Sequence, residues 1–201
     1  MGLQATGMRD AVAAVLLCGG KGARMDGADK GLLDLGGLTL AERAVMKIGP
    51  QVDELLISAN RNIDCYSRFG KVISDEGWGP LSGLRQGMAA SGCAWVFCLP
   101  CDTPFFPEDI VHRLKSALSE SGAQIAIPET KGKTHHAFML LQNALLQDLS
   151  GFLENGGRKV TEWQRRFSCV KVSFQDDLAF HNVNTPEDLR LAETIFSGGK
   201  P

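Results

Sequence analysis

A glycine-rich segment with interspersed basic side chains is the first part of the sequence that suggests a chemistry. It runs from Gly19 to Lys30 and reads Gly-Gly-Lys-Gly-Ala-Arg-Met-Asp-Gly-Ala-Asp-Lys. Glycines let backbone N–H groups approach phosphate oxygens closely, and Arg24 and Lys30 bring charge that neutralises those oxygens. The segment is neither a Walker A loop nor a G-x-G-x-x-G dinucleotide loop. Alone, it predicts either a phosphate-binding loop or a charged surface turn.

Asp102 is the second candidate, because it stands in the run Pro100-Cys101-Asp102-Thr103-Pro104 directly after an apolar segment. A carboxylate held between two prolines at the end of a buried strand is suited to a Mg²⁺ ion that bridges substrate phosphates. An Asp before Thr-Pro also serves as a turn former or a helix cap. For this residue taken alone, both interpretations stand.

The stretch that contains Asp75 and ends in Gly79-Pro80-Leu81-Ser82-Gly83 is a third candidate. A glycine-bounded turn that enters a helix presents backbone groups that could bind a base or a ribose. A plain connection between a strand and a helix has the same composition. On its own, this stretch is better interpreted as the plain connection.

All three stretches follow segments with the pattern of buried strands. Short, continuous apolar runs bounded by turn residues are typical of parallel strands covered on both faces. Strands are predicted at Val12–Leu17, Glu54–Ala59, Lys71–Ser74, Ala94–Leu99, Gln124–Ile127, Phe138–Leu141 and Cys169–Phe174. Helices are predicted at Leu40–Ile48 after the cap Thr39, at Ser82–Ala90, from Pro107 to about Leu118, at Ala144–Leu153, at Arg158–Phe167 and after Thr185-Pro186.

The alternation of strands and helices predicts an α/β fold, with a Rossmann-like, doubly wound, mostly parallel sheet flanked by helices. Residues 1–201 are predicted to form one domain, with residues 1–10 as a leader and 198–201 as a tail. Ligands of such sheets bind outside the carboxyl ends of the strands. A basic glycine loop and a rigid carboxylate at that edge make a phosphate-and-metal site, which phosphoryl or nucleotidyl transfer requires.

The composition argues against several other classes of function. The 201 residues carry a formal net charge of −2, which gives no general attraction for nucleic acid or for an anionic membrane. No apolar run approaches the roughly 20 residues needed to span a bilayer, and residues 1–10 lack the layout of a signal peptide. We therefore expect a cytoplasmic protein with neither nucleic-acid nor membrane partners.

The six cysteines are predicted to be reduced thiols, because no secretory segment accompanies them. Cys98 and Cys101 have the C-x-x-C spacing of a redox or zinc-binding pair. A second ligand pair is missing, and the motif closes an apolar strand instead of opening a helix. Packing at the strand end is the preferred interpretation.

At this point the sequence resembles a known family. Leu17-Cys18-Gly19-Gly20, followed by Arg24-Met25 and Asp29-Lys30-Gly31, is similar to the L-A-G-G-x-x-x-R-M-G-x-D-K signature of sugar-nucleotide and cofactor nucleotidyltransferases. Within that superfamily, the likeness is greatest to the molybdenum cofactor guanylyltransferases. Four further segments carry the resemblance over nearly the whole chain: Ser58–Arg61, Gly79–Gly83, Phe97–Pro104 and Asn182–Glu187.

The resemblance implies a Mg²⁺-dependent transfer of GMP from GTP to molybdopterin, with pyrophosphate as the second product. It implies that Arg24, Lys30 and Asp102 are catalytic and that Asp102 binds the metal. It implies GTP contacts at Leu17, Cys18, Gly19, Gly20, Arg24, Lys30, Ser58, Asn60, Asp75, Gly79, Pro80, Leu81, Gly83 and Asp102, and molybdopterin contacts at His135, Arg158, Asn182 and Asn184. It also implies transient contacts with proteins of molybdenum insertion and molybdoenzyme maturation.

Two alternatives stay open. The first is a cytidylyltransferase that acts on molybdopterin or on a sugar or polyol phosphate; Gly19-Gly20 favours GTP, because related cytidylyl enzymes more often have Ala-Gly and a missing side chain leaves room for the larger base. The second is a non-catalytic carrier of the molybdenum cofactor. Ala23 stands where many members have a second Arg, and Asp26 adds negative charge beside the phosphates.

Overall fold

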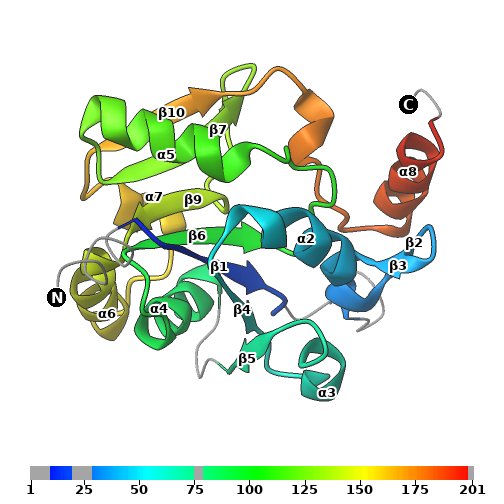
Figure 1. The fold of residues 1–201 in the computed structure, drawn as a ribbon, viewed down its shortest axis with the longest axis horizontal. Helices are drawn as coiled ribbons and strands as arrows, with labels where there is room; N and C mark the ends of the chain where they lie inside the picture. The colour runs from blue at the N-terminus through cyan, green and yellow to red at the C-terminus, as the bar shows by residue number, and fades with distance from the viewer. Residues whose placement is uncertain (1–9, 20–28, 75–78, 199–201) are drawn as a thin grey trace, which may run out of the picture.

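The computed structural model describes residues 10–19, 29–74 and 79–198, and eight of the strands among them form one mixed sheet. The strand order is β10-β7-β9-β6-β1-β4-β5, with β8 paired to β7. At its centre, β1 (Val12–Leu17) runs parallel to both β4 (Glu54–Ser58) and β6 (Trp95–Pro100), and β5 (Lys71–Ile73) is parallel to β4. This half of the sheet (Figure 1) has the doubly wound pattern that the sequence predicts.

The other half of the sheet contains the antiparallel members. β9 (Met139–Gln142) lies between β6 and β7 (Ile125–Thr130) and is antiparallel to both. The two-residue strand β8 (Lys133–Thr134) is also antiparallel to β7, whereas β10 (Cys169–Ser173) is parallel to it. The prediction of a mostly parallel sheet flanked by helices is confirmed, with β8 and β9 as its antiparallel strands.

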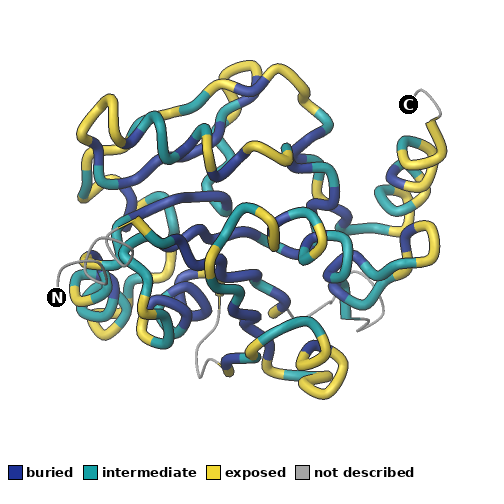
Figure 2. The backbone as a smooth tube through the Cα atoms, in the orientation of Figure 1, coloured by how far each residue is buried: buried dark blue, intermediate teal, exposed yellow. Residues whose placement is uncertain are grey.

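Helices cover both faces of the sheet and create two apolar layers. One face carries α2 (Leu40–Ile48) and α5 (Ile110–Ser121), and the other carries α4 (Pro80–Ala90), α6 (Leu146–Glu154) and α7 (Val160–Gln164). Successive side chains of a strand point to opposite faces. In β1, accordingly, Ala14 and Leu16 enter the first layer and Val15 enters the second. The central strands are therefore buried on both sides (Figure 2).

A smaller apolar cluster joins the last helix to a hairpin at one end of the sheet. The hairpin pairs β2 (Asp34–Leu35) with β3 (Leu38–Thr39), and α8 spans Pro186–Phe196. Leu35, Leu40, Val183 and Ala192 are buried against one another in this cluster. The caps predicted at Thr39 and Thr185 are confirmed, and each forms a capping box with the acidic residue three positions later.

Two predicted helices differ from the structure by more than two residues at an end, whereas α4 and α6 differ from their predicted ranges by at most two. The helix expected from Pro107 begins at Ile110, because Asp109 has non-helical backbone angles and Gln51 accepts the Val111 N–H at 3.2 Å. The helix expected at Arg158–Phe167 is limited to α7, since the guanidinium of Arg158 instead donates to the carbonyl of Leu153 at the end of α6 (2.7 Å).

Within the described ranges, none of the helices has the length and the apolar character needed to cross a membrane.

Gly87 provides a test of the packing between α4 and β1. A Cβ atom at this position would lie 2.2 Å from Cγ2 of Val15, so Gly87→Ala is expected to lower the free energy of unfolding by about 1–3 kcal/mol through overpacking. Gly151 in α6 is the matched control, because a Cβ atom there meets no atom within 4 Å. Gly151→Ala is expected to raise the same free energy by about 0.5–1 kcal/mol. Urea unfolding measures both, and equal effects would contradict the close approach.

Candidate active site

Three parallel strands end side by side and bring their following residues together. The register pairs Leu17 with Ser58 on one side and with Pro100 on the other. The ladder continues past the strand ends, since Cys18 N–H donates to Ser58 O (2.9 Å) and Cys101 N–H donates to Leu17 O (3.1 Å). The start of the glycine loop therefore lies directly between Ser58 and the segment that carries Asp102.

Lys30 links two polar residues that are far apart in the sequence. Its ammonium Nζ lies 3.5 Å from Oδ2 of Asp102 and donates a hydrogen bond to Oδ1 of Asn184. Both members of the ion pair are largely shielded, with 26% of the Lys30 and 15% of the Asp102 side chain exposed. Burial raises the pKa of Asp102, and the charge and hydrogen bond of Lys30 partly oppose this rise. Lys30 thus balances a carboxylate that is costly to ionise.

The segment that carries Asn182 and Asn184 is attached to the Asp102 loop by backbone and side-chain hydrogen bonds. Val183 N–H donates to the carbonyl oxygen of Asp102 (2.7 Å), and Thr103 Oγ1 donates to Oδ1 of Asn182 (3.2 Å). Oδ2 of Asp188, in the capping box of α8, also accepts from the backbone N–H of Asn184 (2.9 Å). The start of α8 therefore fixes both asparagines beside Asp102.

The N-terminal turn of α4 closes over the ends of β1 and β4. A Cβ atom on Gly83 would lie 2.5 Å from Oγ of Ser58 and 2.8 Å from Cδ2 of Leu17, so only glycine allows this approach. Gly79, with φ of +99°, caps the helix, and Pro80 occupies its first turn. Of the residues predicted to contact the nucleotide, Leu17, Cys18, Ser58 and Gly83 are thus shown to be neighbours.

The other predicted nucleotide contacts are placed as follows. Leu81 is buried in the core beneath α4, Gly19 is exposed at the end of β1, and Asn60 accepts a hydrogen bond from Ser74 Oγ (2.9 Å) after β4. Gly20, Arg24 and Asp75 lie outside the described residues.

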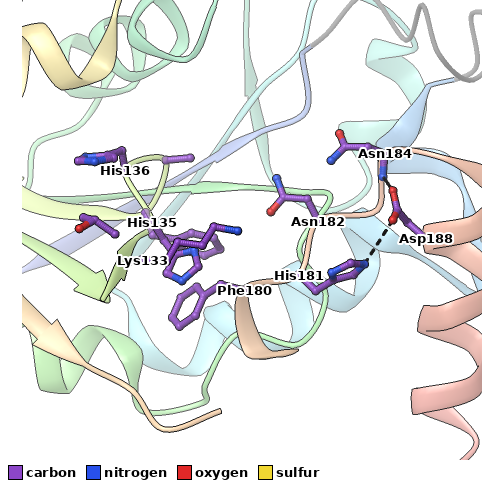
Figure 3. A pocket seen from close by; sticks show the side chains of 11 residues that line it. Lys133, His135, His136, Phe180, His181, Asn182, Asn184 and Asp188 are labelled. Carbon is purple, nitrogen blue, oxygen red and sulfur yellow. Dashed lines mark hydrogen bonds and ion pairs between the residues drawn. The ribbon is translucent and has the colours of Figure 1, made fainter. Parts of the chain in front are cut away.

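A cavity of about 490 Å³ adjoins Asn184 and contains most of the residues predicted for the second substrate. Its wall includes His135 and His136, from the turn between β8 and β9, together with Asn182 and Asn184. In Figure 3, His135 and Lys133 lie over Phe180, whereas Asn184, His181 and Asp188 form the opposite side. Arg158 is the predicted residue that does not line this cavity, because it is exposed at the end of α6.

His135 is held in one orientation by an aromatic ring and a hydroxyl group. Its imidazole stacks on Phe180 with 4.4 Å between ring centroids, and Nε2 lies 2.7 Å from Oγ1 of Thr130. Burial, followed by the charges of Lys133 and His136, lowers the pKa of His135, and Asp177 opposes them. At neutral pH, His135 therefore presents an uncharged ring to the cavity.

Gln164 fixes the neighbouring histidine. Nδ1 of His136 lies 2.6 Å from Oε1 of Gln164, and Nε2 of Gln164 donates to the carbonyl oxygen of His136 (3.2 Å). Gln164 is only 3% exposed, so α7 anchors the turn that carries both histidines.

Several residues of the cavity were not predicted from the sequence. They share no motif and come from strand β8, from the 3₁₀ turn that ends at Phe180 and from helix α8: Lys133, Phe180, His181 and Asp188. Asp188 could have been found, because its place three residues after Thr185 is that of a capping box whose carboxylate reaches back toward the preceding loop. The others are brought together only by the folded chain.

The cysteines of the C-x-x-C motif are packing residues. Cys98 is fully buried, and burial raises its pKa to about 12. The pKa of Cys101 is also well above its usual value, first because of a hydrogen bond with Cys18 and then because of burial. Both thiols stay protonated, and no group of three or more potential metal ligands occurs among the described His, Cys, Asp and Glu residues.

Comparison with known proteins agrees with this geometry. Residues 14–168 match the model of the MobA-like NTP transferase domain. A molybdenum cofactor guanylyltransferase of Burkholderia ambifaria is 44% identical over 191 residues, which are 89% of this chain and 93% of that protein. One from Cupriavidus necator is 40% identical and covers 92% of this chain and 98% of its own length. The chain belongs to the MobA-like NTP transferase family, among the molybdenum cofactor guanylyltransferases.

Solved structures support the same fold for this nucleotidyltransferase. The molybdopterin-guanine dinucleotide biosynthesis protein A of Archaeoglobus fulgidus superposes with a TM-score of 0.78 at 22% identity, over 92% of this chain and 99% of that one. A 4-diphosphocytidyl-2C-methyl-D-erythritol synthase from Anaerococcus prevotii has a TM-score of 0.74 at 13% identity, over 94% and 99%. At these identities the likeness concerns the fold alone.

His135 makes the stability of the nucleotidyltransferase depend on pH. A histidine whose pKa is lower in the folded than in the unfolded chain makes its full contribution to stability above the unfolded pKa of about 6.5, and this contribution is lost as the pH falls from there through the lower folded pKa. When the pH is lowered from about 7.5 to 5, the free energy of unfolding of His135→Gln is expected to fall less than that of the wild type. Urea unfolding at both pH values measures the difference. Identical pH dependence in the two proteins would contradict a buried, neutral imidazole.

Proposed function

We propose that this chain transfers GMP from GTP to the phosphate of molybdopterin and releases pyrophosphate. The observation that carries the proposal is the position of Lys30, whose ammonium contacts both Asp102 and Asn184. Asp102 follows β6 at the sheet edge where the nucleotide loop begins, whereas Asn184 lines the cavity. One cation thus lies at the boundary of two adjoining sites, as a reaction that joins two anionic substrates requires.

The nucleotide half of the proposal uses the ends of β1 and β4 and the start of α4. Cys18 and Gly19 would present backbone groups to the nucleotide, beside the point where Gly83 approaches Ser58 closely. Gly79 caps α4 and Pro80 and Leu81 begin its first turn; Pro80 has no N–H, so the backbone N–H groups of Gly79 and Leu81 would be the ones to face an anion at this helix end. Arg24 and Lys30 would supply the positive charge, and Asn60 and Asp75 the contacts to the nucleoside.

The residues present fit a Mg²⁺ ion held mainly by the substrate. Mg²⁺ keeps several waters and is commonly bound through one or two carboxylates together with substrate phosphates. Asp102 is such a carboxylate: it is mostly buried, its pKa is raised by burial, and its only described counter-charge is Lys30 at 3.5 Å. When bound there, the ion would offset negative charge on the α-phosphate and on the departing pyrophosphate.

The acceptor half of the proposal is the cavity beside Asn184. Its aromatic floor and its amide, imidazole and ammonium groups suit a flat, hydrogen-bonding heterocycle that carries a phosphate. His135 would contact the pterin as a neutral donor or acceptor, and Asn182 and Asn184 would hold its polar edge or phosphate. Arg158, which lies away from this cavity, stays a prediction of the sequence.

The chemistry needs no nucleophilic side chain. A phosphate oxygen of the acceptor is already ionised at neutral pH and would attack the α-phosphorus in line with the departing pyrophosphate. A new P–O bond forms to the acceptor as the bond to pyrophosphate breaks. The main task of Lys30 and Asn184 is then to orient the two anions and reduce their repulsion.

We propose a cytoplasmic setting for this activity. All six cysteines are free thiols, which suits a reducing cytoplasm. Transient contacts with proteins that insert molybdenum or mature molybdoenzymes would hand on the product.

Pyrophosphate release tests the proposal against its two alternatives. The protein is incubated with Mg²⁺, molybdopterin and either GTP or CTP, and we expect release with GTP. Release with CTP alone would instead identify a cytidylyltransferase. Tight binding of GTP and Mg²⁺ without any release would identify a carrier.

Asp102→Asn is the sharpest single variant for the site. It keeps the size of the side chain but removes its charge, so kcat for GMP transfer is expected to fall by about 10²–10³-fold. The free energy of unfolding at neutral pH is not expected to fall, because burial already raises the pKa of Asp102 and disfavours the carboxylate. Asp109→Asn is the matched control at an exposed position and should keep full activity. An active Asp102→Asn enzyme would overturn the proposed metal site.

A further inference from the structure

Asp29, the residue before Lys30, has a nearly buried carboxylate that contacts four groups. Oδ1 accepts from the hydroxyl of Tyr66 (2.6 Å) and from the backbone N–H of Gly31 (3.3 Å). Oδ2 accepts from Nδ2 of Asn62 (2.9 Å) and lies 3.5 Å from Nε of Arg61. Only 6% of the side chain is exposed. Asp29 therefore works as an anchor for the end of the glycine loop.

Three of these four partners come from one short segment after β4. Arg61 and Asn62 precede the single-turn helix α3 (Ile63–Tyr66), and Tyr66 ends it. Asn62 has φ of 52°, a left-handed backbone conformation that turns the chain sharply into this helix. Tyr66 is fully buried in the apolar layer beneath α2 and α5, so its ring is the rigid member of the set.

The anchoring of Asp29 determines where Lys30 can reach. The Asp29 side chain caps the 3₁₀ turn Lys30–Leu32 by accepting from Gly31 N–H, which fixes the backbone of Lys30. A carboxylate without partners beside a lysine would also attract its ammonium group. Because Tyr66, Asn62 and Arg61 satisfy Asp29, the Lys30 ammonium is available to Asp102 and Asn184 instead.

We propose that Tyr66 is a positioning residue for nucleotidyl transfer, whose hydroxyl holds Asp29 and thereby sets Lys30 between Asp102 and Asn184. The inference rests on the role proposed above for Lys30. Tyr66 does not line the cavity beside Asn184, and its hydroxyl donates to Asp29 close to Gly31.

The hydroxyl and the ring of Tyr66 have separable roles. The ring packs in the core beside Gly31 and Cys101, and phenylalanine would preserve that packing. The hydroxyl is the group that reaches Asp29. Burial first, and the nearby Cys18 and Asp29 next, raise the pKa of Tyr66, so the hydroxyl keeps its proton and remains a donor.

Tyr66→Phe is the first test, with pyrophosphate release from GTP and molybdopterin as the measurement. Loss of a hydrogen bond to a charged group is expected to lower kcat about tenfold, because Lys30 spends less time in its working position. Ser67→Ala is the matched control, since it removes an exposed hydroxyl from the next residue, one that contacts Asp64 O and not Asp29. It should keep full activity. Equal kcat values for Tyr66→Phe and the wild type would overturn the inference.

The same substitution in a Lys30→Met background distinguishes a positioning role of Tyr66 from a purely structural one. In Lys30→Met there is no ammonium to position, so adding Tyr66→Phe should lower the residual kcat no further, although thermal stability falls by the same amount in both backgrounds. Equal losses of kcat in the two backgrounds would show a purely structural role and overturn the inference. Unchanged turnover in Lys30→Met alone would instead refute the proposed role of Lys30, and so distinguishes the two failures.

A spectroscopic measurement reports the contact without relying on activity. Tyr66 is the only tyrosine of the chain, so labelling tyrosine with ¹³C at Cζ gives one resonance. Asp29→Asn should shift that resonance, whereas Asp64→Asn, at an exposed position of α3, should leave it in place. This measurement tests the contact between Tyr66 and Asp29 even if the Tyr66→Phe variant folds poorly. An unmoved resonance in Asp29→Asn would overturn it.

Discussion

The pairing of β1 with two parallel neighbours is the constraint on which the site depends. Leu17 is opposite Ser58 in β4 and opposite Pro100 in β6, so three strands end at one level. The hydrogen bonds from Cys18 N–H to Ser58 O and from Cys101 N–H to Leu17 O extend this ladder by one residue into the loops. A slip of one residue in either pairing would reverse the side chains that face each layer of the core. Burial on both faces therefore fixes the relative position of the glycine loop and Asp102.

The charges at this edge are arranged for function at the expense of stability. Asp102 and Asp29 are both largely buried, and each has a cation within 3.5 Å. Burial still raises the pKa of Asp102, which means that Lys30 does not fully compensate for the loss of solvent. A carboxylate in that state interacts strongly with any further cation that enters. Residual electrostatic cost of this kind is consistent with the proposed binding of a metal ion and a polyphosphate at this edge.

The part of the fold that the sequence predicted is the part dominated by local pattern. The strands at Val12–Leu17 and Cys169–Ser173 and the capped helices after Thr39 and Thr185 follow from hydrophobic spacing and cap chemistry. Lys30 and Asp102 could also be predicted as site residues, because each lies in a loop whose composition is unusual for a plain turn. The start of α5 could not be predicted, because it depends on a hydrogen bond with Gln51, a residue about sixty positions earlier in the chain. Tyr66 gave no signal for the same reason, as its hydroxyl acts on Asp29 across 37 positions.

The cavity beside Asn184 shows most clearly why the rest of the site could not be predicted without the folded chain. β9 lies antiparallel between β6 and β7, although helix α5 and β7 separate it from β6 in sequence. This insertion turns the β8–β9 connection, with His135, toward the loop that carries Phe180 and Asn182. The sequence pattern of neither segment predicts that the two lie close together, because their contact arises from the order of the strands in the sheet and not from local propensity. Leu17, Ser58 and Asp102 therefore lie at the ends of adjacent parallel strands, whereas the cavity beside them is lined by β8, the β8–β9 connection, the residues from Phe180 to Asn184 and α8. Substitutions around the cavity can therefore change its lining while leaving the register of β1 intact.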